Sequence, residues 1–188
     1  MRLRIPTIRG TRLARSVVLP GLVAALLVLA GPTAAQTDGT WTNTASGGLW
    51  GAAANWGGGA VADGSGATAF FNTLDITADN TIHLDSARTI GNLIFSDAAT
   101  NTAAGWTIDN NGNPANILTL ASGGTPTITV SALGGGKTAT IATEIAGTGG
   151  LAKTGNGALS LTASNSYSGA TTVGGGGLLI ISDASALG

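Results

Sequence analysis

The chain has 188 residues, the size of a single domain, and charged residues make up only 9% of it. Five of the eight Lys and Arg residues lie in the first fifteen positions, whereas all nine acidic residues come later. The remainder therefore has too few cations for nucleic-acid binding, and the absence of cysteine excludes disulfides and thiol catalysis.

The amino terminus has the three parts of an export signal. Residues 1–15 are basic, residues 16–30 are apolar, and residues 33–35 are small. The apolar run is shorter than the roughly 20 residues that span a bilayer. We predict a signal peptide over residues 1–35, cleaved after Ala35, and no membrane span in the mature chain. An uncleaved membrane anchor is the alternative.

The rest of the chain is predicted to be all-β. It is rich in Gly, Thr, Ser and Asn, which are middling or poor helix formers, and poor in straight-chain helix formers. Apolar residues alternate in short runs that end at Gly, Asn or Ser-Gly. The predicted strands cover residues 81–84, 92–95, 106–108, 117–120, 127–130, 158–161, 171–173 and 178–181.

Many short strands fit either a sandwich or barrel, or a solenoid. A sandwich needs longer strands and larger core residues, but the chain has only four Trp, three Phe and one Tyr. Gly and Asn between the strands suit the tight corners of stacked coils. We therefore predict a right-handed parallel β-helix, with Thr and Asn ladders between coils.

Residues 36–80 are predicted to form a Trp-rich N-terminal cap and the first irregular strands. Trp41, Trp50 and Trp56 would cover the open core of the first coil. Exposed aromatic rings also stack on sugars, so a carbohydrate site is the alternative for these three residues.

Residues 81–148 are predicted to form irregular coils. The few candidates for catalysis lie in this segment or just before it. His83 is the one histidine and is expected on the outer face, without the G-x-S-x-G motif of a catalytic serine. Asp75, Asp79 and Asp85 form the closest acidic cluster, as a polysaccharide lyase or hydrolase would need. Arg88 is the one basic residue near them in sequence, so we expect no catalytic site.

Two Gly- and Asn-rich segments resemble ligand loops but depart from the patterns. Residues 109–113 begin like a calcium loop, yet Pro114 and Leu120 occupy the positions that need Gly and Glu. Residues 134–138 resemble the end of a phosphate loop, yet Ser131 replaces its first Gly. We predict turns at both places, and no metal or cofactor.

Residues 149–188 carry a repeat. Residues 149–180 read GGLAKTGNGALSLTASNSYSGATTVGGGGLLI, and this segment closely resembles the autotransporter-associated β-strand repeat. The residues on the repeat pattern are Gly149, Leu151, Lys153, Gly155, Gly157, Leu159, Leu161, Asn165, Tyr167, Gly169, Thr171, Val173, Gly176 and Leu178. Ala163 replaces the usual Gly. The three tryptophans near residue 50 are similar to the opening of such proteins.

Alternate positions of the repeat are expected to face inward, because one coil must bury its apolar side chains against its neighbours. The expected inward residues are Leu151, the stem of Lys153, Leu159, Leu161, Thr171, Val173, Leu178 and Ile180. We also expect the repeat to be truncated at the carboxyl end of the chain.

The resemblance implies a secreted or surface-displayed passenger, associated with the outer membrane if a translocator follows. We expect a structural or adhesive protein whose partners are host, matrix or glycan surfaces, or a second copy of itself. The alternatives are a β-helical carbohydrate-binding or polysaccharide-degrading protein, and a segment without an independent function.

Overall fold

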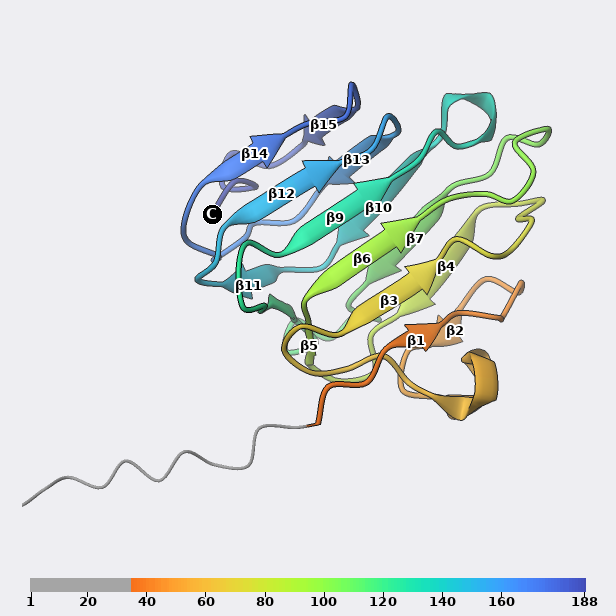
Figure 1. Ribbon diagram of the computed structural model, residues 1–188, viewed down its shortest axis with the longest axis horizontal. Helices are drawn as coiled ribbons and strands as arrows, with labels where there is room; N and C mark the ends of the chain where they lie inside the picture. The colour runs from red at the N-terminus through yellow and green to blue at the C-terminus, as the bar shows by residue number, and fades with distance from the viewer. Residues whose placement is uncertain (1–34) are drawn as a thin grey trace, which may run out of the picture. The chain divides into compact units, whose positions relative to one another are not determined.

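The computed structural model describes residues 35–188 (Figure 1), so the predicted signal peptide lies outside the described residues except for Ala35. Within residues 35–188, no helix is long and apolar enough to cross a membrane. The helical turns of this part are three short 3-10 segments, at Ala53–Asn55, Gly57–Gly59 and Gly134–Gly136. The remaining regular structure is β-strand.

The strands form three sheets in which every neighbouring pair of strands is parallel. Sheet 1 contains β1 (Gly39–Thr40), β3 (Thr68–Phe71), β6 (Asn92–Phe95), β9 (Thr127–Val130), β12 (Leu151–Thr154) and β14 (Thr171–Val173). Sheet 2 contains β2 (Gly48–Leu49), β4 (Asn80–His83), β7 (Trp106–Asp109), β10 (Thr138–Ala142), β13 (Ala158–Leu161) and β15 (Leu178–Ile181). Sheet 3 contains β5 (Arg88–Ile90), β8 (Leu118–Leu120) and β11 (Ile145–Gly147).

Successive strands along the chain belong to successive sheets, so the chain winds in coils that stack along one axis (Figure 1). This arrangement is a parallel β-solenoid, which confirms the predicted fold class. Every predicted strand is present to within one residue at each end. The predicted strands did not include β5, β10, β11 or β12. The runs of β5 and β11 are short, β10 is rich in Ala and Thr, and β12 was expected only as inward-facing positions of the repeat.

The core lies between the three sheets and consists of rows of side chains in register. One inner row of sheet 2 runs through Ile82, Ile108, Ile141 and Leu161, all buried. In sheet 1, Phe71 and Phe95 stack with ring centroids 5.1 Å apart. Burying such a side chain contributes about 1.5–3 kcal/mol, and each coil needs its neighbours for this burial.

The expected orientation of β15 is wrong. Leu179 pairs with Leu159 and Ile181 pairs with Leu161, and both partners are buried in the core. Leu178 and Ile180 therefore lie on the outer face, where we expected them to face inward. The four consecutive aliphatic residues of this strand lack the alternation that would show which pair is buried.

The corners between sheets require glycine because neighbouring coils approach closely there. Gly155 has a φ of 76°, and a Cβ at this position would collide with the carbonyl oxygen of Val130 in the preceding coil. Gly169 has a φ of 100°, and its Cβ would lie 2.8 Å from the backbone nitrogen of Gly150. Only glycine combines this left-handed conformation with this clearance.

The two ends of the stack differ. At the amino end, Trp41, Trp50 and Trp56 are buried and pack against one another and against Phe71. An antiparallel bridge between Trp41 and Trp56 also covers the outer edge of the first coil. At the carboxyl end, by contrast, the last coil leaves large apolar side chains exposed, namely Val173, Leu178, Ile181 and Leu187.

Candidate functional site

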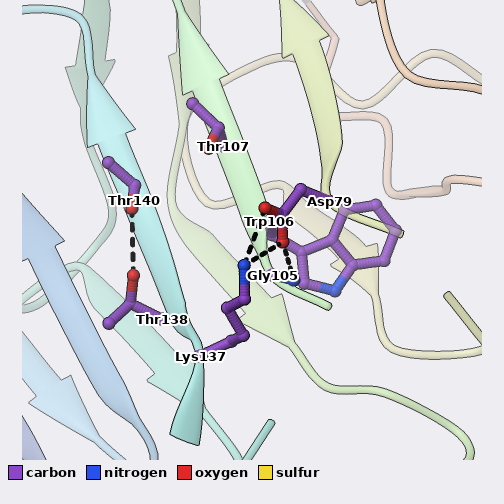
Figure 2. A pocket seen from close by; sticks show the side chains of 7 residues that line it. All are labelled: Asp79, Gly105, Trp106, Thr107, Lys137, Thr138 and Thr140. Carbon is purple, nitrogen blue, oxygen red and sulfur yellow. Dashed lines mark hydrogen bonds and ion pairs between the residues drawn. The ribbon is translucent and has the colours of Figure 1, made fainter. Parts of the chain in front are cut away.

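A polar hollow lies on the outer face of sheet 2, at the start of its strands (Figure 2). Its volume is about 150 Å³. The residues that line it are Asp79, Gly105, Trp106, Thr107, Lys137, Thr138 and Thr140. They come from three successive coils, because Asp79, Gly105 and Lys137 each immediately precede a strand of sheet 2.

An ion pair spans the hollow. The Lys137 Nζ donates to both carboxylate oxygens of Asp79, at 3.0 and 2.8 Å, and the Gly105 backbone N–H donates to the same carboxylate (Figure 2). The hydrogen bond from Lys137 is the main reason why the pKa of Asp79 is lowered from its ordinary value of 3.8. The two charges cancel, so the hollow is polar and locally neutral.

The sequence analysis did not connect Asp79 with Lys137, because they are 58 residues apart. Alignment of the predicted coils with one another would have placed Asp79 and Lys137 at equivalent positions. Both residues stand directly before a strand of the same sheet, with one coil between them.

The candidate acids do not converge on one site. Asp79 bonds to Lys137, whereas Asp85 bonds to Arg88 at 2.8 Å. Asp75 has an exposed side chain and shares no polar contact with either of them within residues 35–188. Nor does this part of the chain contain a group of three or more His, Cys, Asp or Glu residues that could hold a metal ion.

His83 lies on the outer face of sheet 2, as its position between the apolar residues Ile82 and Leu84 predicted. Its partner is Asp109 on the next coil, and the Nδ1 and Oδ1 atoms are 2.6 Å apart. Asp109 also accepts a hydrogen bond from the Asn111 N–H at the start of the following turn. The pair therefore joins two coils and orders the turn after β7.

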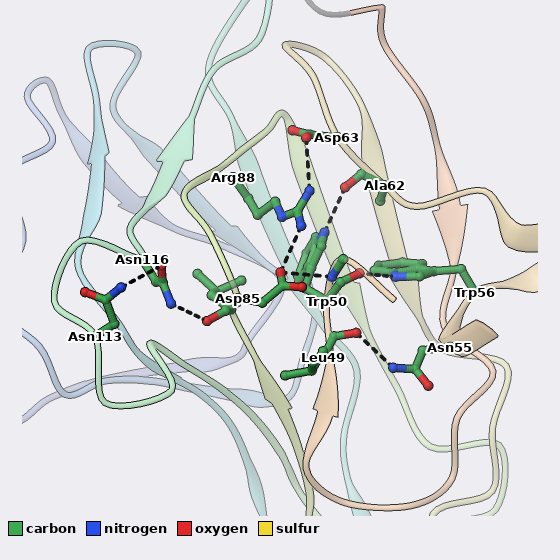
Figure 3. A network of polar contacts seen from close by, with 12 residues as sticks. Leu49, Trp50, Asn55, Trp56, Ala62, Asp63, Asp85, Arg88, Asn113 and Asn116 are labelled. Carbon is green, nitrogen blue, oxygen red and sulfur yellow. Dashed lines mark hydrogen bonds and ion pairs between the residues drawn. The ribbon is translucent and has the colours of Figure 1, made fainter. Parts of the chain in front are cut away.

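A second polar network ties the Trp-rich segment to the coils (Figure 3). Arg88 lies between two carboxylates, with Nη2 2.8 Å from Asp85 and Nη1 3.4 Å from Asp63. Asp85 in turn accepts a hydrogen bond from the Gly51 N–H. Because residues 51 and 63 flank the segment that contains Trp56, Arg88 connects this segment to sheet 3.

The three tryptophans form hydrogen bonds through their indole N–H groups as well as apolar contacts. The Nε1 of Trp50 donates to the Ala62 carbonyl at 2.8 Å, and the Nε1 of Trp56 donates to the carbonyl of Trp50 (Figure 3). All three side chains are at most 2% exposed, so none offers a ring face for stacking on a sugar.

The polar residues of the repeat hold neighbouring coils together. The Oδ1 of Asn165 accepts from the Ile145 N–H at 2.8 Å, and its Nδ2 donates to the Ala186 carbonyl at 2.6 Å. The hydroxyl of Tyr167 bonds to that of Thr171 at 2.7 Å. Asn165 thus bridges the coil before it and the segment after β15.

These contacts belong to a known repeat. Residues 151–180 match the family model of the passenger-associated-transport-repeat. The chain therefore carries an autotransporter passenger repeat, as its sequence indicated, and this repeat implies export to the cell surface. Comparison with curated proteins and with solved structures gave no match.

The passenger repeat occupies β12 to β15 apart from the last residue of β15. The strands β12 and β13 pair in register with β9 and β10, which lie outside the matched segment. The repeat and the preceding coils therefore share the same sheets, although only the repeat matches the family model.

Proposed function

We propose that the chain is part of an exported passenger that is displayed at the cell surface, where its solenoid has a structural and adhesive role. The passenger repeat at residues 151–180, stacked in register on the coils before it, carries this proposal. The predicted signal peptide at residues 1–35 adds a route for export.

A non-catalytic role agrees best with the outer surface. The acids considered for polysaccharide cleavage are engaged with separate cations, Asp79 with Lys137 and Asp85 with Arg88. Most glycoside hydrolases use two carboxyl groups that flank the same bond. We therefore propose that the solenoid displays contact surfaces and does not transform a substrate.

Export can be tested with the full chain. The 188-residue chain, with its own amino terminus, is fused ahead of an outer-membrane translocator in a Gram-negative host. We expect proteinase K added to intact cells to degrade it and antibodies to label it. The control, which lacks residues 1–35, should stay inside the cell. Protection of the full chain in intact cells would overturn the proposal.

A further inference from the structure

The outer face of sheet 2 contains a row of hydroxyl groups. Thr81, Thr107, Thr140 and Ser160 are partners in four adjacent strands, from β4 to β13. Neighbouring strands are about 4.8 Å apart, so the hydroxyls repeat at this distance along the solenoid axis. Thr81, Thr107 and Thr140 are half-buried and offer regularly spaced donors and acceptors, whereas Ser160 is buried.

Two hollows follow one another beside this row. The polar hollow contacts the coils of β4, β7 and β10. A second hollow, of about 200 Å³, lies against the coils of β10 and β13. Lys137 and Asn156 are the polar side chains of its lining, which otherwise consists of Ala, Gly and Leu133. Lys137 lines both, so the hollows adjoin at this residue along the direction of stacking.

We propose that these two hollows and the adjacent hydroxyl row bind a neutral, linear glycan that runs along the solenoid axis. This inference rests on the adhesive part of the proposed function and names its ligand class. The Asp79 carboxylate and the Lys137 ammonium would bond to sugar hydroxyls in the first hollow, and Thr107 and Thr140 would bond to the same chain.

The charge of the face favours a neutral ligand. Lys137 is the cation of the two hollows, and Asp79 already neutralises it. A polyanion would have to displace the Asp79 carboxylate from Lys137. Its own negative charge would then lie beside that carboxylate. An apolar partner is also disfavoured here, because the exposed large apolar side chains of residues 35–188 lie at the ends of the stack, as with Leu49 and Leu178.

Shallow sites of this kind bind weakly. The hollows are open and Trp106, which lines one of them, is fully buried in the core, so no ring stacks on the sugar. We expect a dissociation constant on the order of 1 mM for a hexasaccharide. Many copies displayed on one surface would raise the overall strength of attachment.

The test is an amide NMR titration of the full chain, purified from lysed cells so that it does not depend on export. The probes are three neutral hexasaccharides, cellohexaose, laminarihexaose and maltohexaose, and the anionic hexagalacturonate. We expect at least one neutral probe to shift the amide signals of Thr107, Lys137 and Thr140, and hexagalacturonate to bind at least tenfold more weakly.

Two variants locate the site. The double variant T107V/T140V removes two hydroxyls and keeps the side-chain shape, and K137M removes the ammonium. Each should weaken binding about tenfold. The matched control is T89V/T119V, because Thr89 and Thr119 are register partners on sheet 3. This control should bind like the wild type.

Three results would overturn the proposal: no response to any neutral probe at 10 times the expected dissociation constant of ~1 mM, stronger binding of hexagalacturonate, or unchanged binding by both site variants. The titration uses purified protein, so its failure leaves surface display untouched. A failure of display would likewise leave the binding result standing.

Discussion

Lys153 shows how a single residue of the repeat pattern acts in the fold. The sequence predicted that its aliphatic stem faces inward. The structure buries the whole side chain, and Nζ donates to the carbonyls of Thr154 and Gly155, each at 2.8 Å. The ammonium thus fixes the corner between β12 and β13. Its contacts are with backbone oxygens and not with a carboxylate, so burial of the charge opposes folding.

This burial predicts a pH dependence of stability. Burial lowers the pKa of the Lys153 ammonium below its ordinary value of 10.5. Between the lowered pKa and 10.5, the unfolded chain binds more protons than the folded chain, so stability rises with pH in this range. We expect the urea midpoint of the wild type to rise relative to that of K153M as the pH approaches 10.5.

The measurement is urea unfolding followed by far-ultraviolet circular dichroism at several pH values. Comparison with K153M cancels the titration of all other groups. Equal pH profiles for the two proteins would show that the ammonium is not desolvated.

At the scale of elements, Arg88 joins the Trp-rich segment to the coils. It occupies the first position of β5, in the row that continues through the buried residues Leu118 and Ile145. Its guanidinium therefore lies at the end of an inner row, where it meets Asp63 and Asp85. Its side chain is only 15% exposed, which makes these pairs less screened than surface pairs.

Removal of this guanidinium should loosen the segment. We expect R88M to lower the free energy of unfolding by about 1–3 kcal/mol, because two carboxylates lose a charged partner. Tryptophan fluorescence should detect the change first, since Trp50 and Trp56 lie in this region. The control is K137M, whose exposed ion pair should contribute less than about 1 kcal/mol. Equal losses in the two variants would contradict this role.

The alternation of side chains made most strands predictable, but not the contacts between coils. Predicted strands such as β8 and β9 alternate aliphatic with polar residues. β10 was not predicted because Thr and Ala carry little of this signal, and its pairing with β7 and β13 defines it. The ion pair of Asp79 and Lys137 depends on the same register, which no local pattern encodes.

At the scale of the whole molecule, the open edge of β15 predicts self-association of the 188-residue chain. β15 is the edge of sheet 2, and the residues from Thr171 to Ser182 include no charge and no proline to block pairing with another strand. Such an edge favours addition of a second copy. At the amino end, antiparallel bridges from the Trp-rich segment flank β1, the edge strand of sheet 1.

Lysines on the outer face of β15 should prevent this pairing. We expect the wild type to form oligomers in sedimentation velocity at concentrations where L178K/I180K stays monomeric. The control is L49K, since Leu49 is 40% exposed at the opposite end. It should associate like the wild type. Identical sedimentation of all three proteins would show that the β15 edge does not mediate self-association.

The direction of the hydrogen bonds also determines how the solenoid responds to force. The strands run across the stacking axis, so the bonds between coils point along it. Tension along this axis therefore loads one interface after another, and each coil is held only by its neighbours. The tryptophans that pack against one another strengthen the amino end. The solenoid should consequently yield under load in small steps, one coil at a time.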